Sequence, residues 1–387
     1  MNETAHPALL PTGMHDLLPP EAEIEAFVVA QLMATLTAHG YQRVKPPLVE
    51  FEETLLSGAG AAMATSTFRM MDPVSHRMIG VRADMTPQIA RIAATRLGGA
   101  PRPLRLSYAG QVLRVRGSEI RPERQIGQVG AELIGAAGPA ADVEAIAVAG
   151  AALAALGVPD LTVDITLPTL VPAIAEAYGM GGDAAAALRA ALDHKDAAAV
   201  SALAGQAGKL LERLILAAGP AAATLAALDR LDLPERASAE RARLGAVLDR
   251  LAALAPELKV TVDPVENRGF EYHTGISFTF FACGSPAHGP LGELGRGGRY
   301  DAGDPGASQP ATGFTLYTDT ILRALPEAPA PRRVLLPLGT ERGRAEALRA
   351  AGWVTVAALA PVGDWWAEAV RLGCTHVLEG EMPAAVG

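Results

Sequence analysis

The feature that most constrains the fold is a hairpin pattern that contains no helix between its two strands. Apolar residues alternate from Leu104 onward, and a second strand pattern at 125–134 follows the polar loop 117–124. Consecutive strands joined by a short loop pair antiparallel. Strand patterns within 259–317 also follow one another without helices. A doubly wound parallel sheet needs regular strand–helix alternation, so we expect a largely antiparallel main sheet with helices packed on it.

Helical periodicity flanks these strands. Apolar spacing predicts a helix over 21–39, with Gly40 placed to end it. Residues 44–53 are expected to form a strand entered through Pro46 and Pro47. Residues 170–256 are rich in Ala and Leu at helical period, which predicts an all-helical insert in the α+β core.

The C-terminal part of the chain changes character. The Pro- and Ala-rich stretch 326–331 is typical of a linker. Beyond it, strand and helix patterns alternate in 332–387, which predicts a small βαβαβ unit. We therefore expect a core of residues 1–325 that contains the helical insert, followed by the linker and the small α/β domain.

Charge and cysteine content narrow the classes of function. The 387 residues carry a formal net charge of -9, and long nucleic acids are usually gripped by a basic face. Cys283 and Cys374 form no CxxC pair, and no histidine pair has metal-ligand spacing, so neither a disulfide nor a metal site is expected. The N-terminus lacks a signal-peptide pattern and no stretch suits a bilayer, so we expect a cytoplasmic protein.

Four groups of polar residues interrupt otherwise apolar, strand-like segments. Together they suit a pocket for a zwitterion such as an amino acid, because they combine carboxylates with arginines. The groups are Asp84 with Thr86; Arg114 and Arg116 with the loop 119–124, Gln128 and Glu132; Arg268, Glu271, Tyr272 and His273; and Arg296, Arg299 and Tyr300.

Two features of the second group are ambiguous when taken alone. Gln128, Gly130 and Glu132 share one face of a strand, with Gly130 leaving room between the polar pair. That face either points inward at a polar ligand or outward into water, where most charged residues lie. Arg114, on an apolar strand, is either a surface charge or an anion clamp. The glycine-rich run 295–299 has no phosphate-loop lysine, so a tight turn is expected there.

Read together and in this order, the segments resemble histidyl-tRNA synthetases, a class II aminoacyl-tRNA synthetase family. The resemblance covers about residues 7–325 and implies a class II-like antiparallel sheet flanked by helices, with a homodimer formed through motif 1. It rests on 11–19, on 40–50 (similar to motif 1), on 82–86, on 113–132 (motif 2), on the histidine-specific peptide 268–275, and on 297–301 with Gly313 and Phe314 (the approach to motif 3).

The resemblance also implies which residues face a bound histidine. The acidic residue and threonine of the 82–86 loop hold the amino acid in that family, and the histidine-specific peptide supplies an arginine. The implied histidine-binding residues are Asp84, Thr86, Arg114, Gln128, Glu132, Arg268, Tyr272 and His273.

Most departures from the family pattern lie on the ATP and tRNA side. Arg116 stands where active enzymes have a glutamate, and Thr320 stands where motif 3 ends in an arginine that grips ATP. Losing such a charge-assisted contact costs roughly 1.5–3 kcal/mol in binding. The family's Tyr-Tyr pair is Tyr272-His273 here. The tail, 332–387, is about half as long as an anticodon-binding domain.

This combination resembles the non-catalytic relatives that serve as regulatory subunits of ATP phosphoribosyltransferase. The resemblance implies a chain without catalytic residues or a cofactor that binds and activates a short-form catalytic subunit. It also implies feedback inhibition by L-histidine in the first step of histidine biosynthesis, with no tRNA partner. The alternatives are an active synthetase, a ligase for another small acceptor, and a stand-alone histidine-binding protein. ATP–pyrophosphate exchange would reveal either ligase.

Overall fold

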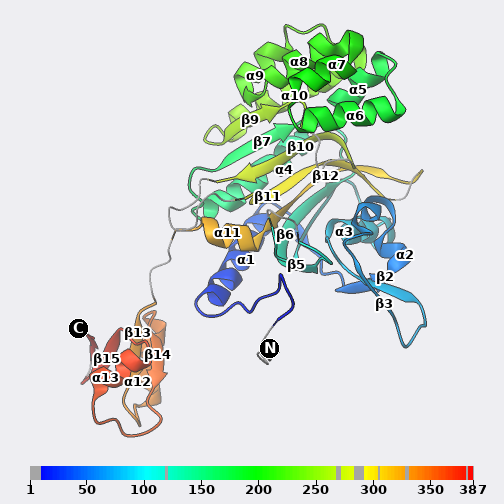
Figure 1. Ribbon diagram of the computed structural model, residues 1–387. Coiled ribbons are helices and arrows are strands. Elements are labelled where there is room, and N and C mark those ends of the chain that lie inside the picture. Colours follow the sequence, from blue (N-terminus) through cyan, green and yellow to red (C-terminus); the bar gives the residue numbers. More distant parts are fainter. Residues whose placement is uncertain are drawn as a thin grey trace, which may run out of the picture. The chain divides into compact units, whose positions relative to one another are not determined.

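The computed structural model describes residues 10–117, 121–266, 272–282, 292–303, 306–326, 331–380 and 382–386. The chain divides into two compact units, Met1–Pro326 and Glu327–Gly387 (Figure 1). Among the described helices, none has both the length and the apolar character needed to cross a membrane.

The larger unit is built on one mixed sheet. Within the described residues nine strands join it, and every neighbouring pair from β5 to β7 is antiparallel. The expectation of a largely antiparallel main sheet is therefore confirmed. In spatial order the strands are β1 (Gln42–Arg43), β5 (Leu104–Leu113), β6 (Gln125–Ile134), β12 (Gln309–Tyr317), β11 (Gly295–Ala302), β10 (His273–Phe281), β7 (Thr162–Thr166), β9 (Lys259–Asp263) and β8 (Gly219–Pro220).

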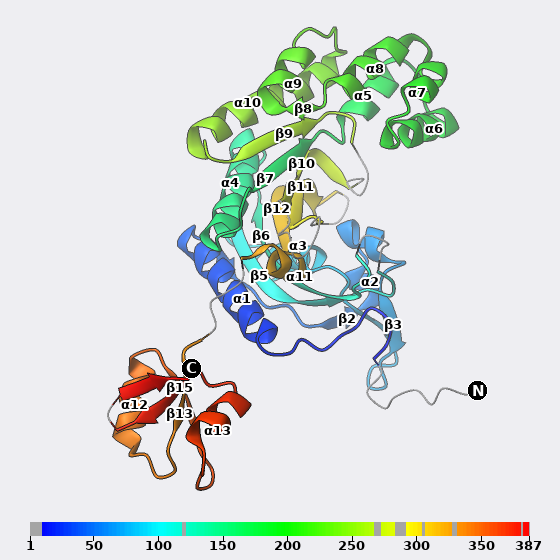
Figure 2. The same ribbon diagram turned by 60° about the vertical axis from the view of Figure 1, so that its left-hand side comes forward.

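Helices cover both faces of this sheet. On one face, α4 (Pro139–Ala155) packs on β6, β10, β11 and β12, and α1 (Glu21–Ala38) packs on α4. On the other face, α3 (Thr86–Thr95) packs on β6 and β11 (Figure 2). Because side chains alternate along a strand, each strand supplies two buried layers. Thus Phe314 of β12 joins the core under α4, whereas Tyr108 of β5 joins the core under α3.

A small sheet and short helices lie beside α3. The sheet has the order β2 (Val49–Phe51), β4 (Met78–Val81) and β3 (Phe68–Met71), all antiparallel. A short α2 (Glu52–Leu55) and a 3-10 helix (Gly58–Met63) follow β2. Another helix of the larger unit, α11 (Thr318–Ala324), continues directly from β12.

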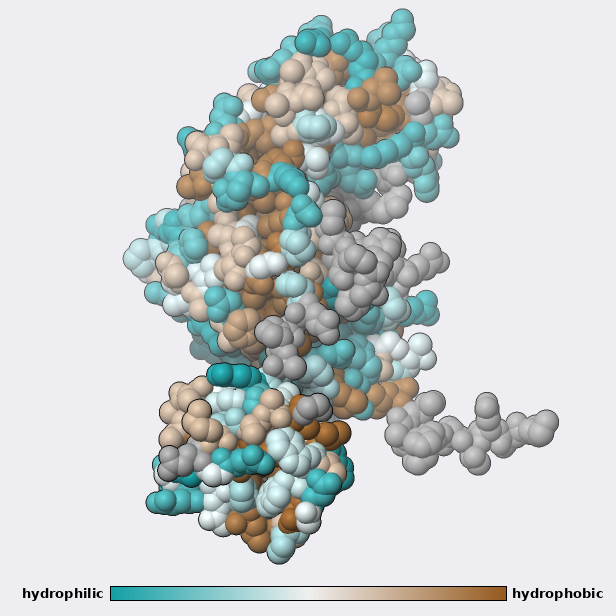
Figure 3. Space-filling view, turned by 90° about the vertical axis from the view of Figure 1, so that its left-hand side faces the viewer, coloured by the Kyte–Doolittle hydropathy of each residue, from teal (hydrophilic) through white to brown (hydrophobic). Residues whose placement is uncertain are grey.

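The insert is helical with one exception, β8, which pairs with the edge strand β9. Its buried leucines, such as Leu211 and Leu244, join the same core as α4. On its surface apolar and polar side chains are mixed (upper part of Figure 3). The helices are α5 (Leu170–Ala177), α6 (Gly182–Asp193), α7 (Ala197–Leu203), a 3-10 turn (Gly205–Ala207), α8 (Gly208–Leu216), α9 (Ala221–Leu228) and α10 (Glu235–Leu254).

Two local expectations were wrong. Residues 44–53 do not form one strand, because Pro46 and Pro47 have no N–H to donate and separate β1 from β2.

The glycine run at 295–298 is not a turn but the start of β11 in the middle of the sheet. A Cβ on Gly297 would lie 2.3 Å from the Gly313 carbonyl oxygen, so these glycines permit close packing rather than chain reversal.

The smaller unit has a four-stranded sheet within its described residues, in the order β14 (Val354–Ala357), β13 (Arg333–Leu336), β15 (His376–Glu379) and β16 (Met382–Ala385). The first three strands are parallel and alternate with α12 (Arg342–Ala350) and α13 (Trp365–Arg371), as a βαβαβ pattern requires. The antiparallel β16 was not expected from the sequence.

Candidate functional site

A small polar pocket lies on the α3 side of the main sheet, over β6, β10, β11 and β12. The cavity measures about 40 Å³, room for a few water molecules in this structure. It is lined by Asp84, Thr86, Glu132, Tyr272, His273, Arg296, Gly297, Gly298, Tyr300, Gly313, Phe314, Thr315 and Tyr317.

The loop before α3 is held by a buried arginine. Arg82 donates from Nε to the Gln111 carbonyl oxygen at 2.8 Å and from Nη1 to the Pro46 carbonyl oxygen at 3.2 Å. Burial lowers the pKa of its guanidinium, and the charge of Glu50 opposes that effect. These bonds fix the loop that carries Asp84 and Thr86.

Asp84 is held by donors on both carboxylate oxygens. Oδ1 accepts the Thr86 backbone N–H at 2.8 Å, and Oδ2 accepts Gln128 Nε2 at 3.0 Å. Gln128, only 1% exposed, also accepts the Met85 backbone N–H at 3.1 Å. Gln128 therefore fixes the carboxylate from behind and leaves the pocket-facing lone pairs of Asp84 for a donor on a ligand.

Glu132 lies at the bottom of the pocket and is 1% exposed. Its Oε1 accepts Thr86 Oγ1 at 3.0 Å, and its Oε2 accepts the Tyr300 hydroxyl at 2.9 Å. Burial raises its pKa to about 8, although the bonds from Tyr300 and Thr86 favour the ionised form. Near neutral pH this carboxyl can therefore either accept a hydrogen bond as an anion or donate one as the neutral acid.

A tyrosine fills the space beneath Gly130. The Tyr108 hydroxyl lies 2.8 Å from Thr315 Oγ1 and 3.3 Å from Thr86 Oγ1. A Cβ on Gly130 would lie 2.4 Å from that hydroxyl. The room left by this glycine is thus occupied by the protein itself. Burial raises the pKa of Tyr108, which keeps it a neutral donor.

Backbone rather than side chains forms much of the pocket wall on β11 and β12. A Cβ on Gly313 would lie 1.7 Å from Glu132 Oε2, and one on Gly298 would lie 2.4 Å from the His273 ring. Glycine is required at both positions because the neighbouring strands place side chains directly over the backbone.

Two aromatic rings at the start of β10 complete the pocket. The rings of Tyr272 and His273 have centroids 4.1 Å apart, and Tyr272 meets the Tyr300 ring edge-on at 6.3 Å. His273 is 7% exposed. Arg268, expected to contact the ligand, lies outside the described residues, as does Glu271.

The side of the pocket next to α11 is rich in arginine. Arg296 donates to the Glu293 carboxylate, with Nε 2.9 Å from Oε1. Arg121, in the motif 2-like loop, lies 4.0 Å above the ring of Tyr317 and donates from Nη2 to Thr320 Oγ1 at 2.9 Å. The same nitrogen donates to the Glu293 carbonyl oxygen at 2.9 Å. Thr320 therefore binds the motif 2-like loop.

The structure brings most of the expected residues together, with some exceptions. Asp84, Thr86, Glu132, Tyr272 and His273 line the pocket, and Gln128 supports it from behind.

Arg114 is not among the lining residues; its Nε lies 3.4 Å from the Ala83 carbonyl oxygen, at the base of the Asp84 loop. Arg116 is exposed. Arg299 points to the opposite face of β11, where its Nε donates to Asp142 of α4 at 3.0 Å, because it is one residue out of phase with Arg296 and Tyr300.

The sequence does not mark every residue at this site as a candidate. Thr315 and Tyr317 line the pocket and Tyr108 lies beneath it, but the sequence pattern indicates only that they belong to strands. A period-two count from Gly313 would have placed Thr315 and Tyr317 on the same face. Only the pairing of β12 with β6 places that face beside Glu132.

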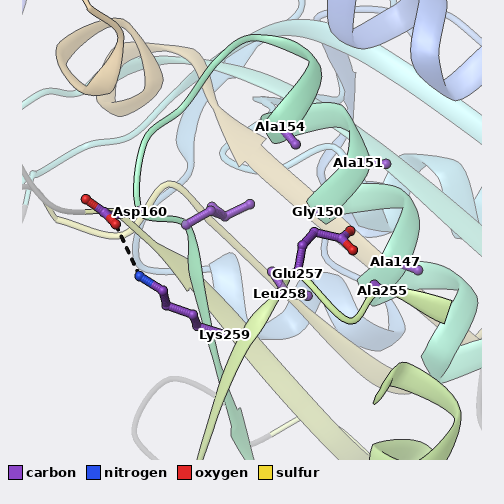
Figure 4. A pocket seen from close by; sticks show the side chains of 10 residues that line it. Ala147, Gly150, Ala151, Ala154, Asp160, Ala255, Glu257, Leu258 and Lys259 are labelled. Atoms are coloured by element: carbon purple, nitrogen blue, oxygen red, sulfur yellow. Dashed lines mark hydrogen bonds and ion pairs between the residues drawn. The ribbon is translucent and has the colours of Figure 1, made fainter. Parts of the chain in front are cut away.

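A second cavity is larger but chemically poorer. It measures about 270 Å³ and lies between α4 and the segment that leads into β9. Small residues such as Gly150 and Ala154 wall it, and at its rim Asp160 accepts from Lys259 at 3.1 Å, with Glu257 across from them (Figure 4). It lacks convergent buried polar groups that could orient a ligand, so the smaller pocket is the stronger candidate site.

In the described parts of the chain, no cluster of three or more His, Cys, Asp or Glu side chains has the geometry of a metal site.

Comparison with known proteins agrees with this geometry. The family model described as histidyl-tRNA synthetase matches residues 13–321. Two relatives named ATP phosphoribosyltransferase regulatory subunit are each 58% identical. That of Paramagnetospirillum magneticum aligns over 98% of this chain and 98% of its own length. That of Rhodospirillum centenum aligns over 96% of this chain and 95% of its own.

Solved structures show the same fold. A Bacillus halodurans protein described as an ATP phosphoribosyltransferase regulatory subunit/histidyl-tRNA synthetase superposes with a TM-score of 0.79 at 26% identity. That superposition covers 96% of this chain and 97% of the other. A histidyl-tRNA synthetase from Nostoc, at 19% identity, superposes with a TM-score of 0.76 over 96% of this chain and 90% of its own. The expected class II synthetase-like fold is thereby confirmed.

Proposed function

Because this chain belongs to the histidyl-tRNA synthetase-like family of ATP phosphoribosyltransferase regulatory subunits, we propose that it activates a short-form catalytic subunit and conveys feedback inhibition by L-histidine. It contributes no catalytic residue and no cofactor of its own to the reaction. The complex acts in the cytoplasm, at the first step of histidine biosynthesis.

The observation that carries this proposal is the pair of carboxyl groups in the pocket, Glu132 buried and Asp84 half-buried. Asp84 and Glu132 offer acceptors for an ammonium group and for a ring N–H, and each is already fixed by neutral donors. The resemblance to the synthetases implies that Arg268, outside the described residues, balances the carboxylate of the ligand, whereas Arg114 lies at the base of the Asp84 loop. Tyr272 and His273 bound the ring side. These side chains suit a ligand that has one carboxylate and two nitrogen groups that are positively charged or donate hydrogen bonds. Histidine is such a ligand.

The other side of the pocket supports a regulatory rather than a ligase role. Position 320 holds a threonine, whose hydroxyl accepts from Arg121, so this position contributes no cation of its own for a triphosphate. Arg116 puts a positive charge where a glutamate would act. The chain is thus suited to sensing histidine without activating it.

Regulation requires two states of the complex that differ in their affinity for histidine, because an effector shifts an equilibrium only by its differential binding. The inhibited state is the one that binds histidine more tightly. By reciprocity, substrates that favour the active state must weaken histidine binding by the same factor.

The chain also acts as a homodimer through its motif 1-like region, residues 40–50. Beside this region the β3–β4 hairpin exposes four large apolar side chains, Met70, Met71, Val74 and Met78. Exposed apolar side chains grouped in this way are typical of an interaction surface. Light scattering of the purified chain measures the mass directly; a monomer at micromolar concentration would contradict the dimer.

The decisive experiment measures ATP phosphoribosyl transfer by a short-form catalytic subunit, with and without this chain, across an L-histidine titration. We expect stimulation that histidine reverses. Glu132→Gln is expected to keep the stimulation and lose the inhibition, whereas Lys259→Met, which alters a distant surface pair, should behave as wild type. Absence of stimulation with a competent partner would overturn the proposal, and ATP–pyrophosphate exchange would then test the ligase alternative.

A further inference from the structure

A buried carboxylate lies on the face of the main sheet opposite the pocket. Asp142, near the start of α4, is fully buried. Its Oδ1 accepts Arg299 Nε of β11 at 3.0 Å and the Thr312 hydroxyl of β12 at 2.8 Å. Arg299 and Thr312 are partners in the register of these two strands. One carboxylate of α4 therefore holds both strands at the same level of the sheet.

At this level the other face of the two strands meets Glu132. Side chains alternate along a strand, so the residues next to Arg299 and Thr312 face the pocket. Tyr300 donates to Glu132 Oε2 at 2.9 Å. Gly313 is the register partner of Glu132, and a Cβ there would lie 1.7 Å from the same oxygen. A shift of either strand would therefore move a group that lies directly against the Glu132 carboxyl.

A cation from the helical insert also binds Asp142. Arg243, on α10, donates to Asp142 Oδ2 from Nε at 3.2 Å and from Nη2 at 3.0 Å. Its Nη2 also donates to the Ala137 carbonyl oxygen at 2.9 Å, in the connection between β6 and α4. The helices α10 and α4 pack against each other (Figure 2). A charged side chain thus joins the insert to the carboxylate that holds β11 and β12.

The two arginines bind different oxygens and differ in exposure. The Arg299 side chain is 5% exposed and also donates to the Ala136 and Gly138 carbonyl oxygens. The Arg243 side chain is 25% exposed. Among the described residues, both hydrogen bonds to Asp142 Oδ2 come from Arg243. Without that arginine a buried carboxylate oxygen has no donor, which is costly in a site closed to water.

We propose that Arg243 is a positioning residue for the pocket, acting through Asp142 and the two strands that Asp142 holds. When Arg243 is withdrawn, the carboxylate turns toward its remaining donors, and β11 and β12 are displaced with it. Ligand affinity and the seating of α10 on α4 are therefore linked, and the link is reciprocal. This inference rests on the proposed function, since it takes L-histidine as the ligand of the pocket. It gives the helical insert a role in the response to that ligand.

Isothermal titration of the full chain with L-histidine tests the proposal. Arg243→Met keeps the aliphatic stem but removes both donors to Asp142, and we expect it to weaken histidine binding by about fivefold. Arg243→Lys, which keeps one charged donor, should recover part of that loss. Arg241→Met removes an ion pair to Asp229 from the same helix and should bind histidine as wild type does. Unchanged affinity in Arg243→Met would overturn the proposal.

A second control separates positioning from a general loss of stability. Val247 is a fully buried residue of α10. Val247→Ala lowers the free energy of unfolding by leaving a cavity, but it keeps the pair of Arg243 and Asp142. We expect this variant to retain wild-type histidine affinity. If Val247→Ala and Arg243→Met lose affinity equally at equal urea midpoints, the role of Arg243 is merely structural and the proposal is wrong.

A double-mutant cycle tests the route through β11. Tyr300→Phe removes the hydroxyl that joins this strand to Glu132. Because the two changes then act on the same contact, we expect Arg243→Met to weaken histidine binding only about twofold in the Tyr300→Phe chain. An equal loss in both backgrounds would contradict the route through Tyr300 and Glu132.

The two proposals fail in different ways. A wild-type chain that binds no histidine contradicts the proposed function and, with it, this role of Arg243. A wild-type chain that binds histidine, together with unchanged affinity in Arg243→Met, contradicts the role of Arg243 alone.

Discussion

The two sides of the pocket differ in how their charged groups are satisfied. On the loop side, Asp84 and Glu132 are bonded by neutral donors: an amide, a backbone N–H and hydroxyls. On the α11 side, Arg121 and Arg296 are bonded to the protein's own carboxylates, carbonyl oxygen and hydroxyl. A charge held by neutral partners keeps its capacity for an opposite charge, whereas one that already has a counterion does not.

The loop side of the pocket should therefore contribute mainly to ligand binding, and the α11 side mainly to the stability of the fold. Substitutions on the loop side should mainly change histidine affinity, and those on the α11 side should mainly change the free energy of unfolding. Variants on each side distinguish the two roles, and the largest effect is expected at Glu132.

Glu132→Gln is expected to weaken L-histidine binding by about 100-fold, because it removes a buried carboxyl group that can ionise opposite a cationic group of the ligand. The three groups around the side chain are hydroxyls that can also accept a hydrogen bond from the new amide. The fold should therefore persist, with a thermal midpoint close to wild type. Titration calorimetry measures the affinity. A change of less than threefold would contradict the assignment of ligand binding to the loop side of the pocket.

The stability of the chain should depend on pH through Glu132. Its pKa is about 8 in the folded protein, against an ordinary value of 4.5. Between these values the folded state binds more protons than the unfolded state, so the free energy of unfolding falls as pH rises. The slope reaches about 1.4 kcal/mol per pH unit inside that window.

Urea unfolding at pH 6, 7 and 8 checks this pH dependence. The Glu132→Gln protein has no carboxyl at this site, so its stability should fall less steeply with pH than that of wild type. Parallel slopes for the two proteins would show that Glu132 is ionised throughout this range.

Arg121→Met should lower the free energy of unfolding by about 2 kcal/mol and change histidine affinity less than threefold. Arg121 is the cation nearest the largely buried Asp319 carboxylate, at 3.8 Å, and removing it leaves that charge poorly compensated.

Arg323→Met is the matched control for this change. Arg323 is 43% exposed and lies 4.0 Å from the same carboxylate, so its removal should cost less than about 1 kcal/mol. Urea unfolding compares the two variants. A larger loss of histidine affinity in Arg121→Met than in Glu132→Gln would reverse the assignment of the two sides.

Much of the fold could be predicted because it depends on local periodicity. The helix over α1, the helical insert, the β5–β6 hairpin and the alternation in the C-terminal unit all follow from apolar spacing within one segment. Predictions failed where a residue's role depends on a neighbour distant in the sequence. The glycines of β11 resemble a turn until β10 and β12 are seen packed against them, and the space under Gly130 is filled by Tyr108 from another strand.

The amino-acid sequence alone indicates the strand and helix pattern, the polar groups in the strand segments, and the changes at Arg116 and Thr320 that weigh against ligase chemistry. Which of those polar side chains are in contact depends on the tertiary structure. It turned Gln128 and Glu132 inward, sent Arg299 to the opposite face, and paired Arg121 with Thr320 and Arg243 with Asp142. The physical reason is that the face of a strand follows from its period, but what that face meets follows from sheet order and register, which depend on contacts far apart in the chain.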